Sequence, residues 1–154
     1  MNIIALGLVP DVSRSHDFTV SVHIDGEPLI ETVRRIEASH RQAIGSDPSV
    51  SRYQWVRAGV MLRPGQHLLG TPNSPWLPGF SEVLVCNCGE AACGAIGVSV
   101  RVWGEYVGWL AWRQFPLTEA CLSCEWRPLV FHRPQYEAEL DRVSEEYRRA
   151  RHNV

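Results

Sequence analysis

Alternating hydrophobic and polar residues indicate several β-strands. In DFTVSVHID, residues 17–25, every second position from Phe18 to Ile24 is apolar. A period of two predicts a half-buried strand whose polar face is open to solvent. Residues 2–9 form an unbroken apolar run that predicts a buried strand, and 53–62 and 82–86 are further strand candidates.

A hairpin is predicted over residues 95–112. Apolar residues alternate from Ile96 to Val102, and Gly104-Glu105 then supplies a two-residue turn with glycine first. That order matches the turns that strand twist prefers, so the return strand is expected at 106–112.

Two segments have the helical period instead. Apolar residues three and four apart predict a helix over 28–42, after Pro28, with Gly45 as a stop. Near the C-terminus the apolar positions are Tyr136, Leu140, Val143 and Tyr147, and the opposite side is charged. This pattern predicts an amphipathic helix packed on a sheet.

The proline-rich residues 63–80 between these segments predict a surface loop.

Together these elements predict one α+β domain over residues 1–154, with a mainly antiparallel sheet, an amphipathic C-terminal helix and one further helix. The composition is that of a globular protein, with 45% hydrophobic and 21% charged residues. The net charge of -2 gives no electrostatic reason to expect binding to nucleic acid or to an anionic membrane. No apolar run approaches the length of a membrane span, so a cytoplasmic protein is expected. An unknown protein partner is possible, and the sequence does not indicate the oligomeric state.

The five cysteines are the main candidates for chemistry. Three lie within LVCNCGEAAC, residues 84–93, and two lie in CLSC; the candidate metal ligands are Cys86, Cys88, Cys93, Cys121 and Cys124. An odd number of thiols excludes a complete disulfide framework, and a tight cluster in a reducing compartment favours metal or redox chemistry.

Three interpretations of the cysteines remain open. Four sulfur ligands would suit a structural zinc ion, with three from the first group and one from the second; His67 and His132 are alternative fourth ligands. A redox pair would use Cys121 and Cys124, or Cys88 and Cys93. Otherwise the cysteines pack as small apolar side chains.

No catalytic constellation accompanies the cysteines, which favours a non-enzymatic domain. Under this hypothesis the chain is a protein-interaction module that acts through the hairpin or the proline-rich loop. The alternative is a thiol oxidoreductase or redox sensor. The hairpin aromatic residues Trp103, Tyr106, Trp109 and Trp112 serve either core packing or a binding face.

The run LVCNCGEAACGAIGVSVRVWGEYVGWLAW, with LRPGQHLLG before it and PLVFHRPQYEAEL after it, resembles a group of small uncharacterised bacterial proteins that are common in actinomycetes. Members of that group share a C-x-C-G-x3-C link before a hairpin. The resemblance implies the same order of elements and implies no activity. Its members usually have the equivalents of Cys86, Cys88 and Cys93 without a later CxxC, which leaves the roles of Cys121 and Cys124 open. The group also usually has an acid where His132 stands.

Overall fold

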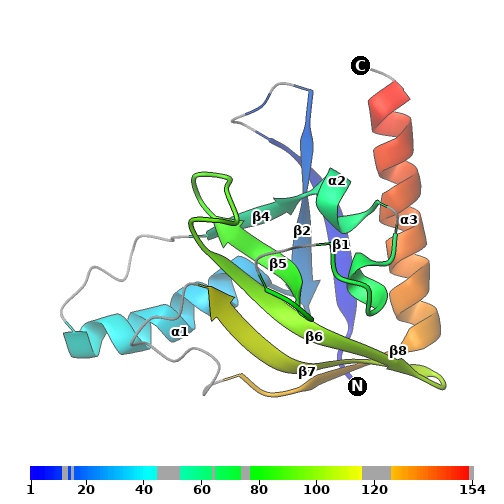
Figure 1. The fold of residues 1–154 in the computed structure, drawn as a ribbon. Coiled ribbons are helices and arrows are strands. Elements are labelled where there is room, and N and C mark those ends of the chain that lie inside the picture. The colour runs from blue at the N-terminus through cyan, green and yellow to red at the C-terminus, as the bar shows by residue number, and fades with distance from the viewer. Residues whose placement is uncertain are drawn as a thin grey trace.

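The computed structural model describes residues 1–11, 14, 16–44, 53–63, 65–73, 77–115 and 126–152, without the side chains of residues 38–44. Within these residues one sheet has the strand order β1-β2-β4-β5-β6-β7-β8, with the short β3 paired to β2, and every strand pair is antiparallel (Figure 1). The strands are β1 Ile4–Pro10, β2 Phe18–Ile24, β3 Glu27–Pro28, β4 Tyr53–Arg57, β5 Ser81–Cys86, β6 Ala95–Trp103, β7 Tyr106–Phe115 and β8 Leu129–His132.

The described residues include the helices α1 Leu29–Ile44, α2 Ala58–Met61 and α3 Arg133–His152, and a 3₁₀ turn at His67–Leu69. In Figure 1, β1 and β2 run between α1 and α3. The predicted α+β fold with a mainly antiparallel sheet and a C-terminal helix is therefore confirmed, and α2 is an additional short helix.

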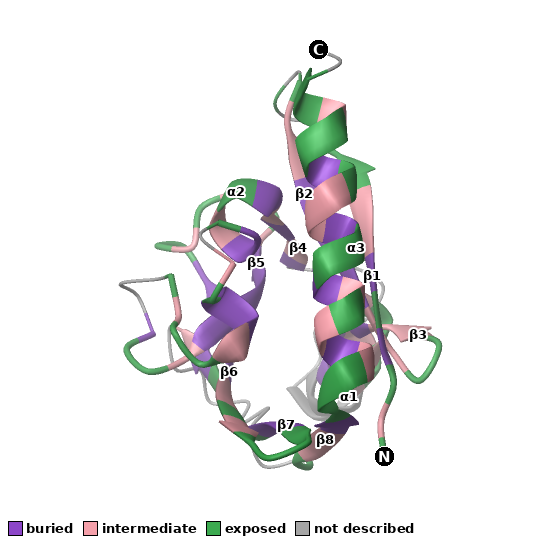
Figure 2. Ribbon diagram, turned by 90° about the vertical axis from the view of Figure 1, so that its right-hand side faces the viewer, coloured by how far each residue is buried: buried purple, intermediate pink, exposed green. Residues whose placement is uncertain are grey.

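The helix α3 buries the predicted face against the sheet. Tyr136, Leu140, Val143 and Tyr147 are all buried. Figure 2 shows buried positions recurring along α3 between exposed ones. The Tyr136 hydroxyl accepts a hydrogen bond from Trp109 Nε1 at 3.0 Å and donates one to the Leu68 carbonyl at 2.7 Å. Because buried polar groups are costly without partners, this chain of hydrogen bonds fixes α3, β7 and the 3₁₀ turn in one arrangement.

The two end strands of the sheet approach each other at Asn2. Its N–H donates to the Val130 carbonyl at 2.8 Å, and its Oδ1 accepts from the Val130 N–H at 3.1 Å. Farther along β1, Gln135 donates to the Ile4 carbonyl and Arg142 donates to the Leu6 carbonyl. These α3 side chains occupy acceptors that an exposed edge strand would otherwise present to another chain.

Three details differ from the sequence predictions. The strand expected over 53–62 ends at Arg57, because Ala58 and Met61 are buried together from one turn of helix. The short strand β8 was not predicted. The run over 2–9 predicted a fully buried strand, but in β1 buried Ile4 and Leu6 flank exposed Ala5.

The polar face of β2 is less open to solvent than its alternation predicted. Thr19 is 6% exposed and Ser21 is 7% exposed. Their hydroxyls donate to the carbonyls of Val9 and Gly7 on β1, both at 3.3 Å. Burial of these small polar side chains is tolerated because each has a backbone partner.

Within the described part of the chain, no helix is both long and apolar enough to cross a membrane.

Candidate metal centre

The cysteine cluster lies at one end of the central strands, where β5 leads into β6. Cys86 is the last residue of β5, and Cys88 and Cys93 lie in the connecting loop, residues 87–94. The loop contains two tight turns: the Gly89 N–H donates to the Cys86 carbonyl at 2.8 Å, and the Cys93 N–H donates to the Glu90 carbonyl at 3.0 Å. Gly89 has a φ of +89°, in a region that glycine adopts without the penalty of a Cβ.

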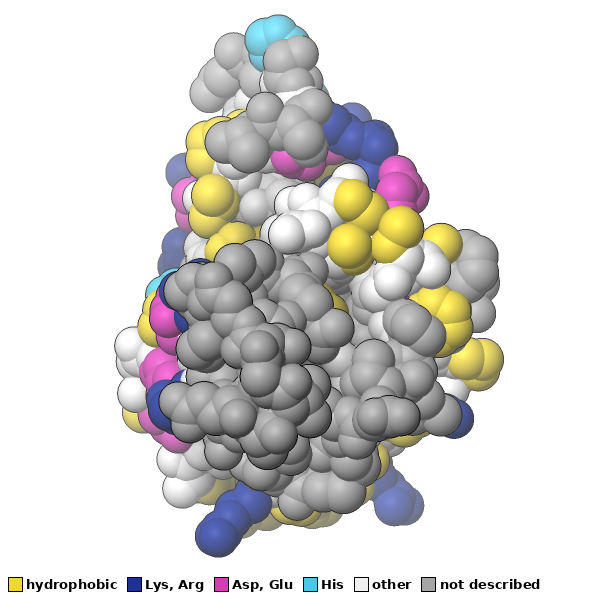
Figure 3. All heavy atoms as spheres, turned by 90° about the vertical axis from the view of Figure 1, so that its left-hand side faces the viewer, with side chains coloured by type: hydrophobic (Ala, Val, Ile, Leu, Met, Phe, Trp, Pro, Cys, Tyr) yellow, Lys and Arg dark blue, Asp and Glu magenta, His cyan; other side chains and the backbone are white. Residues whose placement is uncertain are grey.

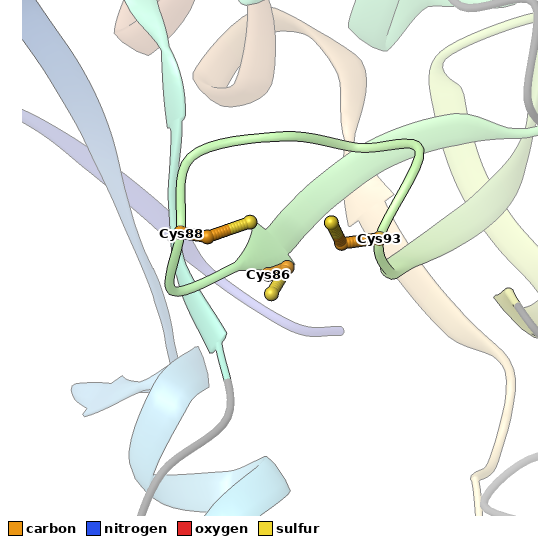
Figure 4. A group of neighbouring side chains, drawn as sticks. All are labelled: Cys86, Cys88 and Cys93. Atoms are coloured by element: carbon orange, nitrogen blue, oxygen red, sulfur yellow. The ribbon is translucent and has the colours of Figure 1, made fainter.

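The three sulfur atoms converge. All lie within 4.8 Å of one another, with Cys88 and Cys93 on the two limbs of the loop and Cys86 between them (Figure 4). Sulfurs around a tetrahedral zinc ion are about 3.8 Å apart when each Zn–S bond is about 2.3 Å. The sulfurs are therefore within about 1 Å of the separation that a shared zinc ion requires. Among the described residues this is the one group of three or more potential metal ligands, and it can hold a metal ion.

The loop backbone favours a thiolate at Cys88. The N–H of Glu90 donates to the Cys88 sulfur and lowers the pKa of that thiol, and hydrogen bonds from Cys86 and Cys93 act in the same direction. The pKa of Cys93 is raised, because its thiol donates a hydrogen bond to Cys88 and faces the negative charge that develops there. Metal ligation requires thiolates, so a lowered pKa at Cys88 is compatible with a role as a ligand.

Neither histidine proposed as a fourth ligand is available at the cluster. His67 is fully buried; its Nδ1 accepts a hydrogen bond from the Asn73 N–H at 2.9 Å, and its Nε2 lies 2.8 Å from the Glu82 carbonyl. His132 pairs with Tyr106 at the hairpin end of the sheet. The nine residues of β6 separate that end from the cysteines by roughly 25 Å.

Cys121 and Cys124 lie outside the described residues. The described residues that flank residues 116–125 are fixed near the cysteine end of the sheet. Phe115 pairs with Ala95, two residues after Cys93. Trp126 stacks on Trp112 of β7, with ring centroids 3.9 Å apart.

Arg57 also contacts the cysteine loop, which the sequence analysis did not identify. Its Nη2 donates to the Gly89 carbonyl at 3.4 Å and lies 3.6 Å from a Glu90 carboxylate oxygen. The same Glu90 oxygen lies 3.6 Å from Arg14 Nη2. Because 32 residues separate Arg57 from Gly89, no local sequence pattern reports this contact.

The hairpin aromatic residues divide into two groups. Trp109 and Trp112 are buried and pack edge to face, with ring centroids 5.7 Å apart. Near the hairpin turn, Trp103 and Tyr106 are 39% and 40% exposed, and Leu110 on β7 is 38% exposed. From the sequence, these aromatic residues served either core packing or a binding face. In the structure the hairpin contains both buried and exposed aromatic side chains.

The described surface does not show a continuous field of one charge on the face drawn in Figure 3. Basic and acidic side chains lie side by side along the margin of that face, and hydrophobic side chains form small groups between them.

Comparisons with other proteins give no relative: no family model, no curated protein and no solved structure matches this chain.

Proposed function

We propose that this chain is a non-enzymatic cytoplasmic protein-interaction domain, in which Cys86, Cys88 and Cys93 bind a structural zinc ion. The observation that carries the proposal is the convergence of the three sulfurs within 4.8 Å. Thiolates are the commonest ligands of structural zinc, and binding would cross-link the two limbs of an exposed loop. The free energy of metal binding would thereby become part of the stability of this end of the sheet.

A fourth thiolate from Cys121 or Cys124 would complete a tetrahedral site. Cys121 follows Phe115 by six residues, and an extended chain of that length reaches roughly 20 Å. Cys124 precedes Trp126 by two residues. Since Phe115 pairs with Ala95, chain length does not prevent either cysteine from reaching the other three.

The direct test is the metal content of protein purified without chelator. We expect about one equivalent of zinc per chain, a stoichiometry set by four ligands to one ion. Protein with less than about half an equivalent and five reactive thiols would contradict the proposal.

Cobalt(II) substitution identifies the ligands, because tetrahedral sulfur coordination gives cobalt characteristic visible absorption. We expect Cys88→Ser and Cys93→Ser to remove that absorption. Of Cys121→Ser and Cys124→Ser, one should change the spectrum and the other should leave it unaltered, so each is the matched control of the other. If neither changes the spectrum, the fourth ligand comes from elsewhere.

The exposed end of the hairpin supports the proposed interaction. Trp103 and Tyr106 lie together, with ring centroids 5.9 Å apart, and remain partly open to solvent. Exposed aromatic pairs of this kind are enriched at protein interfaces. By contrast, the proline-rich loop is anchored by buried His67, Leu68 and Leu77. The hairpin is therefore the better supported of the two surfaces.

A second candidate function is a redox sensor that uses Cys88 and Cys93. Both thiols are exposed and their sulfurs lie within disulfide-forming reach after a small loop movement. Mild treatment of metal-free protein with a hydroperoxide would form a Cys88–Cys93 disulfide, and peptide mapping would locate it. The same mapping would show no disulfide at this pair if the thiols serve only as metal ligands.

A further inference from the structure

The side chain of Arg57 reaches the cysteine loop from a neighbouring strand. Arg57 ends β4, and β4 pairs with β5 through Tyr53 opposite Cys86. Arg57 is therefore four residues along β4 from Tyr53, the residue that lies opposite Cys86. Its guanidinium nevertheless contacts Gly89 and Glu90 in the loop after Cys86. The loop must fold back along β4 for these contacts to form.

The contact falls on the turn that carries Cys88. Arg57 donates to the carbonyl of Gly89, the residue directly after Cys88. The N–H of the same glycine donates to the Cys86 carbonyl at 2.8 Å. A guanidinium that holds the Gly89 carbonyl therefore helps to fix the turn between Cys86 and Gly89, and with it the position of Cys88.

The charge of Arg57 acts in the same direction. A zinc ion held by three or more thiolates carries a net negative charge, which nearby cations and N–H donors stabilise. Arg57 is partly withdrawn from solvent, with 28% of its side chain exposed, whereas Arg14 is 48% exposed. Burial reduces screening, so Arg57 is the more effective of the two arginines that approach Glu90.

We infer that Arg57 is a positioning residue for the cysteine metal site, which fixes the turn that carries Cys88 and offsets the negative charge of the metal–thiolate group. This inference rests on the proposed metal-binding function. It assigns no direct ligation to Arg57.

The test compares cobalt(II) affinity in Arg57→Gln, Arg57→Lys and Arg35→Gln, measured by competition with a chelator. Arg35→Gln is the matched control, because it also removes an arginine that forms an ion pair with a glutamate, here Glu27. Glu27 pairs with Ile24 at one end of β2, whereas β4 pairs with the other end of β2, at Thr19 and Val20. Loss of a group that orients a metal ligand typically weakens affinity 10- to 100-fold. We expect affinity to fall about 10-fold in Arg57→Gln, to recover in part in Arg57→Lys, and to change less than about twofold in Arg35→Gln.

Two further readouts separate positioning from folding. The cobalt absorption of saturated Arg57→Gln should retain the wild-type band shape, since no ligand is lost. Metal-free Arg57→Gln should unfold cooperatively at a temperature close to that of metal-free Arg35→Gln. If Arg57→Gln does not fold, the cobalt affinity of Arg57→Lys is compared with that of the wild type instead.

The inference is overturned if Arg57→Gln binds cobalt as tightly as Arg35→Gln, or if Arg57→Lys loses as much affinity as Arg57→Gln. Failure of the wild-type protein to bind cobalt at all is a different result, which overturns the proposed metal site and the role of Arg57 with it.

Discussion

The α3 interface and the cysteine loop are stabilised in different ways. Around Tyr136, large side chains are buried, and both hydrogen bonds of the Tyr136 hydroxyl link it to distant segments, at Leu68 and Trp109. In the cysteine loop, Cys88 and Cys93 are exposed and Cys86 is half-buried, and the contacts include short-range turn hydrogen bonds and ion pairs at 3.6 Å. Exposed ion pairs contribute little stability. If the proposed function is right, the core folds without metal, whereas the cysteine loop becomes equally rigid only when a metal ion is bound.

The largest effect is expected from Tyr136→Ala. The substitution leaves a cavity and removes the partner of Trp109 Nε1, so unfolding free energy should fall by about 3–5 kcal/mol. Urea denaturation measures the loss, and cobalt affinity of the remaining folded protein should be unaltered. Tyr136→Phe, which removes only the hydroxyl, should lose about 1–3 kcal/mol. An equal loss in both variants would show that the hydrogen bonds, rather than packing, dominate this interface.

The next largest effect is the loss of metal-dependent stability in Cys88→Ser. At a free zinc concentration 100 times Kd, binding stabilises the wild type by about 2.7 kcal/mol, and the variant should gain nothing from zinc. Without metal the two proteins should agree within about 0.5 kcal/mol, since Cys88 is exposed. Thermal unfolding with and without zinc gives both comparisons. A variant that is much less stable even without metal would show that Cys88 has a packing role in the loop.

Acid should weaken the core through His67. Burial lowers the pKa of His67 below its ordinary value of 6.5, so the unfolded chain takes up a proton before the folded one does. Stability contributed by neutral His67 is therefore complete above about pH 6.5 and decreases as the pH falls toward the lowered pKa, by at most about 1.4 kcal/mol per pH unit.

Urea denaturation of metal-free protein at several pH values below neutrality measures this slope. His67→Gln should reduce the slope, and the same change at exposed His132 should leave it as in the wild type. A slope that persists unchanged in His67→Gln would assign the pH dependence to other groups.

The smallest effect is expected from Gly89→Ala, with Gly26→Ala as its control. Gly89 and Gly26 have φ values of +89° and +85°, and neither site has a neighbour closer than 3.6 Å to an added Cβ. Both substitutions should therefore cost a similar backbone strain of about 1–2 kcal/mol. Only Gly89→Ala should also weaken cobalt binding, because only that strain acts on the cysteine loop. Equal cobalt affinity in the two variants would mean that the turn geometry at Gly89 does not control the site.

The sequence predicted the elements in which a regular period continues over many residues. In α3 the four apolar positions from Tyr136 to Tyr147 are the four buried ones, because the helical period is repeated over 20 residues. The hairpin of β6 and β7 was also predicted, with its turn at Gly104-Glu105. Helix α2 and strand β8 have four residues each, too few to establish a period.

The candidate site was predicted as far as its residues are close in the chain. The spacing of Cys86, Cys88 and Cys93 identified a group whose sulfurs do converge. The contribution of Arg57 depends on how β4 and the loop fold against each other, and the burial of His67 depends on Glu82 and Asn73. Neither arrangement has a local sequence signal. The assignment of Cys121 and Cys124 stays a prediction.

Hydrogen–deuterium exchange of the zinc-loaded and the chelator-treated protein tests the central claim most directly, because it reports the two regions separately. We predict that removal of zinc accelerates exchange strongly at residues 87–94 and leaves the amides of β7 and of α3 around Tyr136 protected. Equal exchange at residues 87–94 in the two samples, or a loss of protection throughout the sheet and α3, would contradict the account.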